Sequence, residues 1–322
     1  MPHALIAGKI HPDGLAILRA RADLTIEEMA DLSAEAFAAR LPDADALLIR
    51  TAPLPAAAVE RAGRLRIVSR HGVGYDNVPL PELTRRGIPL AVIGNVNSAA
   101  VAEHTLMLML ALAKRTWHFD RAVRDGAWDL RNRLTPGDLE GSTLLILGLG
   151  RIGREVARRA AAFDMRILGY DPAVSAASMA EAHVTPVGDW RAALGQADFV
   201  TLHLPRTAET RHMIGAAELA LMKPSAFLLN TARGGLVDEV ALAEALAAGR
   251  IAGAGLDVLE DEPPARDHPL LGSERAILSP HVASLSQSAA VRMGVVSATN
   301  LLAGLDGTLD PKLVVNPEVL RR

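Results

Sequence analysis

The sequence contains no cysteine. This absence excludes disulfide bonds, thiolate metal ligands and cysteine nucleophiles, and it fits a cytoplasmic protein. Lysine is also scarce, since only four of the 34 basic residues are lysines, and the formal net charge is −3. Because a nucleic-acid surface needs clustered positive charge, we expect no nucleic-acid partner. No spacing of His, Asp and Glu matches a metal site, so we expect no metal.

Long apolar runs are missing as well. The longest unbroken one, at residues 105–113, is too short for a bilayer, which takes about 20 residues. Residues 1–14 lack the basic-then-apolar pattern of a signal peptide. Aromatic residues make up only 3% of the chain, but half of its 322 residues are hydrophobic, so the core must consist of aliphatic side chains. We expect a cytoplasmic protein without a membrane partner, of about two domains with roughly 150 residues each.

Short apolar segments alternate with amphipathic, alanine-rich ones, a rhythm typical of parallel sheets covered by helices. We expect strands near residues 3–8, 44–50, 65–69 and 88–92, and then near 143–148, 165–170, 199–204, 225–230, 253–258 and 276–280. We expect helices near residues 12–21, 33–40, 55–62, 79–86, 98–116 and 285–304, with a polar connection after residue 116. The two series of strands predict two α/β domains, each with its own parallel sheet.

The strongest local motif follows the apolar segment 143–147 and reads Gly148-Leu-Gly150-Arg-Ile-Gly153. In a dinucleotide site Gly148 permits a tight turn, Gly150 lets the pyrophosphate approach the backbone, and Gly153 lets the next helix pack close to the sheet. The helix N-terminus then offers free N–H groups to the phosphates. The motif predicts a bound dinucleotide, with Arg151 and Ile152 of the same turn counted among the cofactor-binding residues.

Asp171 follows the next expected strand. A carboxylate at this place accepts hydrogen bonds from the adenosine ribose and repels a 2′-phosphate, so the sequence favours NAD over NADP. A glycine turn in a nucleotide-free protein is the alternative.

Three later strands are each followed by polar residues, among them Arg233, Glu262 and His281. Reduction of a 2-keto acid needs a guanidinium fork for the carboxylate, a proton donor for the carbonyl oxygen, and a carboxylate that favours the protonated histidine. These residues could fill the three roles in that order: Arg233, His281, Glu262. Taken singly, each could equally be a surface or structural residue.

The segments Asn230-Thr-Ala-Arg233-Gly-Gly, Leu256-Asp257-Val-Leu-Glu-Asp-Glu262-Pro and Ser279-Pro-His281 resemble motifs of the D-isomer-specific 2-hydroxyacid dehydrogenases, and the glycine turn lies where that family has it. The resemblance covers nearly the whole chain. It implies that Arg233, Glu262 and His281 are catalytic and that Asp257 contacts the nicotinamide. It also implies that Leu204, Pro205 and Thr231 belong to the cofactor site.

The same resemblance implies a flavodoxin-like substrate-binding domain, residues 1–98 and 288–322, and a Rossmann NAD-binding domain, residues 99–287. It further implies a homodimer through the helix 98–116 and the arm Trp117–Trp128 that follows.

Four N-terminal residues carry a substrate pattern. The turn at Val73 and Gly74 could offer N–H groups to a carboxylate. Arg50 and Arg70 resemble the phosphate-side arginines of the phosphoglycerate-oxidising family members, which favours 3-phosphoglycerate or a similar dianionic acid. Many of those members carry a C-terminal regulatory domain, and because the sequence stops at Arg322 we expect a short form without one. Hydroxypyruvate or glyoxylate reduction is the alternative, and a corepressor-like NAD(H) sensor is the alternative from another class.

Overall fold

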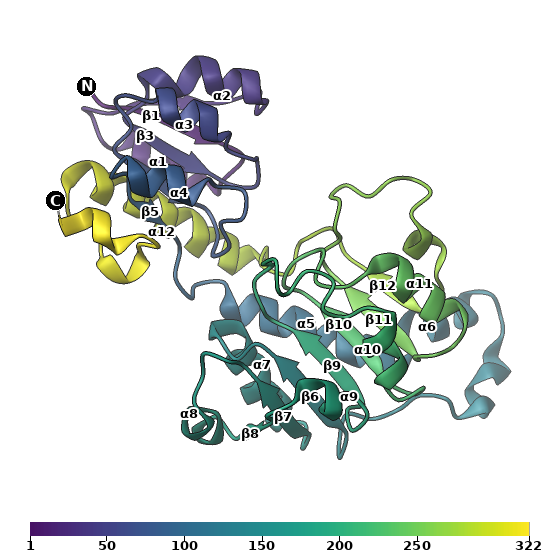
Figure 1. Cartoon of the computed structure of the whole chain (residues 1–322). Coiled ribbons are helices and arrows are strands. Elements are labelled where there is room, and N and C mark those ends of the chain that lie inside the picture. The colour runs from purple at the N-terminus through teal and green to yellow at the C-terminus, as the bar shows by residue number, and fades with distance from the viewer. Residues whose placement is uncertain (322) are drawn as a thin grey trace. The chain divides into compact units, whose positions relative to one another are not determined.

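A computed structural model describes residues 1–321 of the chain (Figure 1). The chain forms two compact units: unit 1 holds Met1–Asn97 and the segment from Leu285 to the C-terminal end, and unit 2 holds Ser98–Ser284. In both units every pair of neighbouring strands in the sheet is parallel. The predicted fold class, α/β with two parallel sheets, is confirmed.

Unit 1 contains a five-stranded sheet in the order β2-β1-β3-β4-β5, the flavodoxin-like order. The strands are β1 (His3–Ala7), β2 (Thr25–Glu28), β3 (Ala46–Ile49), β4 (Ile67–Arg70) and β5 (Leu90–Ala91). The helices are α1 (Pro12–Arg19), α2 (Ala34–Arg40), α3 (Ala56–Arg61), α4 (Leu80–Arg85) and α12 (Gln287–Asp306). The sequence analysis missed β2, because this edge strand is polar and has no fully buried residue.

Helix α12 is the central helix of unit 1 and packs against α1, β3 and β4. Gly14 of α1 meets Gly294 of α12 so closely that a Cβ on Gly14 would lie 2.5 Å from the Gly294 carbonyl oxygen. Among the described residues, α12 alone is long and apolar enough to cross a membrane. The buried hydrogen bond from Ser69 of β4 to the carbonyl of Ser297 shows instead a helix packed on a sheet.

Unit 2 contains a seven-stranded sheet in the order β12-β11-β10-β9-β6-β7-β8, in which β8-β7-β6-β9-β10-β11 is the Rossmann order. The strands are β6 (Thr143–Leu147), β7 (Arg166–Tyr170), β8 (Thr185–Pro186), β9 (Phe199–Leu202), β10 (Phe227–Asn230), β11 (Gly253–Leu256) and β12 (Ala276–Leu278). The helices are α5 (Ser98–Lys114), α6 (Thr116–Arg124), α7 (Arg151–Ala161), α8 (Ala176–Glu181), α9 (Trp190–Leu194), α10 (Ala216–Leu221) and α11 (Glu239–Ala247).

Helix α5 lies on β10 and β11. A Cβ on Gly255 would lie 3.2 Å from Leu108 Cβ, so the glycine of β11 lets the helix approach the sheet. The expected single helix 98–116 ends earlier, at Lys114, because Arg115 adopts a left-handed conformation with φ of 51°. The polar connection expected after residue 116 contains two helical segments that the sequence analysis did not place, α6 and a 3-10 helix, Trp128–Arg133. Helix α6 is amphipathic, with Trp117, Phe119 and Val123 set among charged residues, so its sequence did carry a helical pattern that the sequence analysis overlooked.

Candidate active site

Three neighbouring strands of unit 2 end at the same edge of its sheet. In the parallel register Asn230 pairs with Leu256, and Leu256 pairs with Leu278, the last residues of β10, β11 and β12. The loops that follow these strands carry Arg233, Glu262 and His281 respectively. Carboxyl ends of strands are the usual ligand-binding edge of open α/β sheets.

His281 and Glu262 form a hydrogen-bonded pair, with 2.8 Å between His281 Nδ1 and Glu262 Oε2. The backbone holds both residues in place. The N–H of His281 donates to the carbonyl of Asp257 over 2.7 Å, and the N–H of Leu259 donates to Glu262 Oε1 over 3.2 Å. The two side chains are 41% and 39% exposed, so a small molecule can reach them. Because Nδ1 faces the carboxylate, Nε2 is the nitrogen that can exchange a proton with a ligand.

Glu262 keeps its negative charge to a lower pH than an ordinary glutamate does. Its partial burial acts to raise the pKa of the carboxyl group, but the hydrogen bond and charge of His281, the Leu259 N–H and the charge of Arg233 outweigh this and lower the pKa. Glu262 is therefore ionised at neutral pH. A carboxylate in contact with an imidazole favours the protonated ring.

The loop that carries Arg233 is shaped by Asn230. The Asn230 side-chain amide donates to the Arg233 carbonyl over 2.7 Å, and its oxygen accepts from the Ala232 N–H over 3.0 Å. Gly234 then packs against the loop of Glu262, where a Cβ would lie only 1.8 Å from the Leu259 carbonyl oxygen. This backbone-to-backbone contact keeps Arg233 near Glu262. The sequence analysis gave Asn230 no role, although an asparagine just before a chain reversal is a known turn signal.

Asp257 is 1% exposed and accepts several internal hydrogen bonds. Its Oδ1 accepts from Ser279 Oγ over 2.6 Å and from the Val282 N–H over 2.9 Å, and its Oδ2 accepts from the Ala283 N–H over 2.9 Å. The structure thus shows Asp257 supporting the segment that carries His281. The expected contact with nicotinamide stays a prediction.

The glycine turn fits the pyrophosphate of a dinucleotide. Gly148 has a φ of +100°, and a Cβ on Gly153 would lie 2.0 Å from the Gly148 carbonyl oxygen, so neither position accepts a side chain. A Cβ on Gly150 would meet nothing within 4 Å, which leaves room for a ligand against the backbone. Helix α7 begins at this turn, and Gly150 offers no capping side chain. The N–H groups of its first turn, which includes Arg151 and Ile152, therefore point to where an anion binds.

Asp171, at the end of β7, also supports this turn. Its Oδ2 accepts from the Leu149 N–H and its Oδ1 from the Ala173 N–H, each over 2.8 Å. Leu204 and Pro205 follow β9, the strand beside β6. A Cβ on Gly148 would lie 2.6 Å from the backbone carbon of His203, so this segment directly adjoins the glycine turn.

Thr231 is 6% exposed, with its hydroxyl 2.9 Å from Thr105 Oγ1 of α5. Thr105 uses its single hydroxyl proton to donate to the Val101 carbonyl, so Thr231 is the donor in this pair. Its oxygen retains the capacity to accept a hydrogen bond.

The predicted substrate residues lie in unit 1. Arg70 donates through Nη1 to the His71 carbonyl and through Nε to Asn77 Oδ1, so its guanidinium lies over the turn that contains Val73 and Gly74. His71 is 4% exposed. Burial, together with the charges of Arg50 and Arg70, lowers the pKa of His71 to about 4. Both guanidinium groups therefore act on one neutral imidazole at this edge of the sheet.

Comparisons with known proteins identify the family of this chain. The family model of the D-isomer specific 2-hydroxyacid dehydrogenase NAD binding domain matches residues 106–283. The chain is 38% identical to D-3-phosphoglycerate dehydrogenase of Methanocaldococcus jannaschii over 99% of its length and 60% of the relative, and 41% identical to glyoxylate reductase of Korarchaeum cryptofilum over 99% and 97%. The crystal structure of D-lactate dehydrogenase from Aquifex aeolicus with NAD and lactic acid has a TM-score of 0.88 at 27% identity and covers 97% of this chain and 99% of that one.

The chain belongs to the D-isomer specific 2-hydroxyacid dehydrogenase family. It is an NAD-dependent D-2-hydroxyacid dehydrogenase. Its length spans about 60% of the phosphoglycerate dehydrogenase and nearly all of the glyoxylate reductase that it matches.

Asp171 offers a test of the cofactor site. Asp171→Asn keeps a side-chain oxygen for the glycine turn but removes the negative charge, so the ratio of kcat/KM with NADP to that with NAD is expected to rise at least about tenfold, equivalent to about 1.4 kcal/mol. Asp164→Asn is the matched control, since Asp164 is an exposed aspartate whose left-handed φ of 55° suits asparagine. Equal ratios in Asp171→Asn and wild type would contradict the assignment of Asp171.

Proposed function

We propose that Arg233, Glu262 and His281 are the catalytic residues and that the substrate is a D-2-hydroxy acid with a second anionic group, 3-phosphoglycerate or a similar dianion. The observation that carries the catalytic assignment is the 2.8 Å hydrogen bond between His281 and Glu262, formed beside an arginine whose charge acts on the same carboxylate. A proton donor, a charge that supports it and a cation for the substrate carboxylate are thereby combined in one unit.

NAD, when bound, supplies the chemistry of hydride transfer at C2 of the substrate. In the direction of reduction, His281 Nε2 donates a proton to the keto oxygen, and the ionised Glu262 stabilises the imidazolium beforehand. Arg233 binds the substrate carboxylate with its guanidinium fork and orients the keto group. In the direction of oxidation, His281 Nε2 accepts the hydroxyl proton.

His281→Asn is expected to lower kcat roughly 10²–10⁴-fold with cofactor affinity retained, because no proton donor remains.

Glu262→Gln removes the charge that favours protonated His281, so the alkaline limb of the kcat/KM profile for reduction should move to lower pH. Activity should accordingly fall more at about pH 8 than at about pH 6. Asp261→Asn, the exposed neighbour of Glu262, is the control and should keep the wild-type profile. A wild-type profile in Glu262→Gln would refute its role.

The cofactor site that we propose is the predicted one. The N–H groups at Gly150, Arg151, Ile152 and Gly153 would hold the pyrophosphate, as the open space at Gly150 supports, and Gly148 would make the tight turn before them. Asp171 would bind the adenosine ribose, with Leu204 and Pro205 beside the adenosine. Thr231 and Asp257 would lie near the nicotinamide.

The proposed substrate rests on positive charge in unit 1. Arg50 and Arg70 both lower the pKa of His71, so two cations lie near one point at the carboxyl edge of the sheet. The turn at Val73 and Gly74 would bind the carboxylate, and the two arginines would bind the second anionic group.

Reduction of glyoxylate or hydroxypyruvate is the second candidate function. It is favoured by the hydrogen bonds of Arg70 to its own turn, since these give Arg70 a structural task that needs no substrate phosphate.

A substrate panel separates the two candidates. With a dianionic substrate, Arg50→Gln should raise KM for phosphohydroxypyruvate at least about tenfold and KM for hydroxypyruvate less than about threefold, since charge-assisted hydrogen bonds are the stronger ones. Arg70→Gln should act in the same direction, and Arg61→Gln on the distant surface of α3 serves as control. If wild type prefers hydroxypyruvate or glyoxylate, or if Arg50→Gln affects both substrates equally, the second candidate is right.

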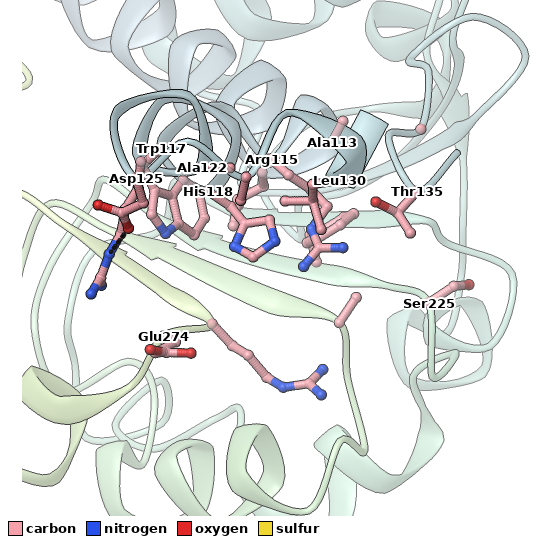
Figure 2. A pocket seen from close by; sticks show the side chains of 17 residues that line it. Ala113, Arg115, Trp117, His118, Ala122, Asp125, Leu130, Thr135, Ser225 and Glu274 are labelled. Carbon is pink, nitrogen blue, oxygen red and sulfur yellow. Dashed lines mark ion pairs between the residues drawn. The ribbon is translucent and has the colours of Figure 1, made fainter. Parts of the chain in front are cut away.

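We also propose that the enzyme is a cytoplasmic homodimer formed through α5 and the arm that follows. The arm exposes large apolar side chains, with Val123 57% and Trp128 62% exposed, and Leu134, a few residues after the arm, is 86% exposed. A groove of about 980 Å³ runs between this segment and residues such as Ser225, Phe227 and Arg275. Figure 2 shows Trp117 and His118 of α6 on one side and Glu274 on the other. In a twofold dimer each arm could cover the other copy's surface, which would bury the apolar side chains of both.

Trp128→Asp places a charge on the proposed contact and should shift the protein from dimer to monomer in analytical ultracentrifugation, since a buried unpaired charge is costly. Leu271→Asp is the control, because Leu271 is 47% exposed but lies outside the arm. A monomeric wild type, or a dimer that tolerates Trp128→Asp as well as Leu271→Asp, would rule out this interface.

A further inference from the structure

His104 of α5 lies against the catalytic edge of unit 2, although no motif predicted a role for it. Its Nε2 is 2.9 Å from Ser279 Oγ and 3.6 Å from Asp257 Oδ1. The side chain is only 16% exposed, so the contact is largely shielded from water. Ser279 and Asp257 both belong to the loops that follow β11 and β12. His104 therefore connects a helix to the segment that carries His281.

The direction of each hydrogen bond follows from the number of protons. Ser279 has one hydroxyl proton and donates it to Asp257 Oδ1 over 2.6 Å. Its oxygen can then only accept from His104, so His104 must carry a proton on Nε2. The chain of donation thus runs from His104 to Ser279 and from Ser279 to the Asp257 carboxylate, which is almost fully buried and needs such donors.

Asp257 in turn fixes the backbone of His281 and of the two residues that follow it. Its carbonyl accepts the His281 N–H, and its carboxylate accepts the N–H groups of Val282 and Ala283. His281 has a φ of 52°, in the left-handed region that is unfavourable for residues other than glycine. Such a conformation persists only where its surroundings enforce it. The same backbone conformation directs His281 Nδ1 to Glu262.

We propose that His104 is a positioning residue that acts through Ser279 and Asp257 to hold His281 in the geometry of proton transfer. This inference rests on the proposed function, because it takes His281 as the proton donor. The hydrogen bond and ion pair of His104 go to Ser279 and Asp257, so it acts by keeping the Asp257 carboxylate in the orientation that binds residues 281–283.

The neighbouring residue provides a matched comparison. Thr105 accepts a hydrogen bond from Thr231, in the loop that leads to Arg233. Two consecutive residues of α5 thus support two different loops. A change at Thr105 should act on substrate binding through Arg233, whereas a change at His104 should act on proton transfer through His281.

The experiment compares His104→Leu, His104→Gln and Thr105→Val by steady-state kinetics with the best 2-keto acid and by NADH fluorescence titration. His104→Leu should lower kcat about ten- to hundredfold, the effect of one lost hydrogen bond in a charged network, with KM and the Kd for NADH within about threefold of wild type. His104→Gln retains a terminal N–H donor and should recover kcat to within about threefold. Thr105→Val should raise KM more than it lowers kcat.

Ser279→Ala keeps the inference testable if His104→Leu folds poorly. It breaks the chain of donation in the middle, so it should lower kcat similarly, and adding His104→Leu should cause little further loss. The inference is overturned if His104→Leu keeps wild-type kcat, if His104→Gln is as impaired as His104→Leu, or if Thr105→Val shows the same pattern as His104→Leu. Full turnover in His281→Asn would instead refute the proposed function itself, on which this inference depends.

Discussion

The close contact between the loops of Gly234 and Leu259 is the constraint on which the proposed catalytic arrangement depends. With no room for a Cβ at Gly234, the backbones of the Arg233 and Glu262 loops touch, and the arginine charge acts on the Glu262 carboxylate. That carboxylate then stays ionised and pairs with His281. Because β10, β11 and β12 are parallel neighbours, their loops begin at one edge, and the contact needs no long connection.

Motifs and hydrophobic patterns predicted the fold class and most strands and helices, because short apolar strands alternate with helices along the chain. The elements that were missed have different explanations. Strand β2 is a polar edge strand, and α6 begins only because Arg115 turns the chain with a left-handed conformation. Periodicity reports which face of an element is buried. It does not report where a single residue ends one helix and lets another begin.

The residues of the candidate site also differ in whether their roles could be predicted from the sequence. The roles proposed for Arg233, Glu262 and His281 could be derived from chemistry and from resemblance, since their residue types suit the reaction. The supporting roles of Asn230, Ser279 and His104 could not, because serine, asparagine and histidine make structural hydrogen bonds throughout proteins. Their function depends on partners far away in the sequence, such as the 175 residues between His104 and Ser279. Only the folded chain brings these together.

Exposure separates the two groups of residues for a physical reason. His281 and Glu262 are about 40% exposed, which suits the contact with substrate proposed for them, whereas Asp257 is 1% exposed. In a buried environment of low dielectric constant, hydrogen bonds to a carboxylate are stronger than in water, and a buried carboxylate without hydrogen bonds is costly. Asp257 is therefore suited to fixing the unfavourable backbone of His281. In the proposed mechanism the imidazole of His281 can remain accessible to substrate, because the buried carboxylate of Asp257 accepts three hydrogen bonds and thereby fixes the segment that carries it.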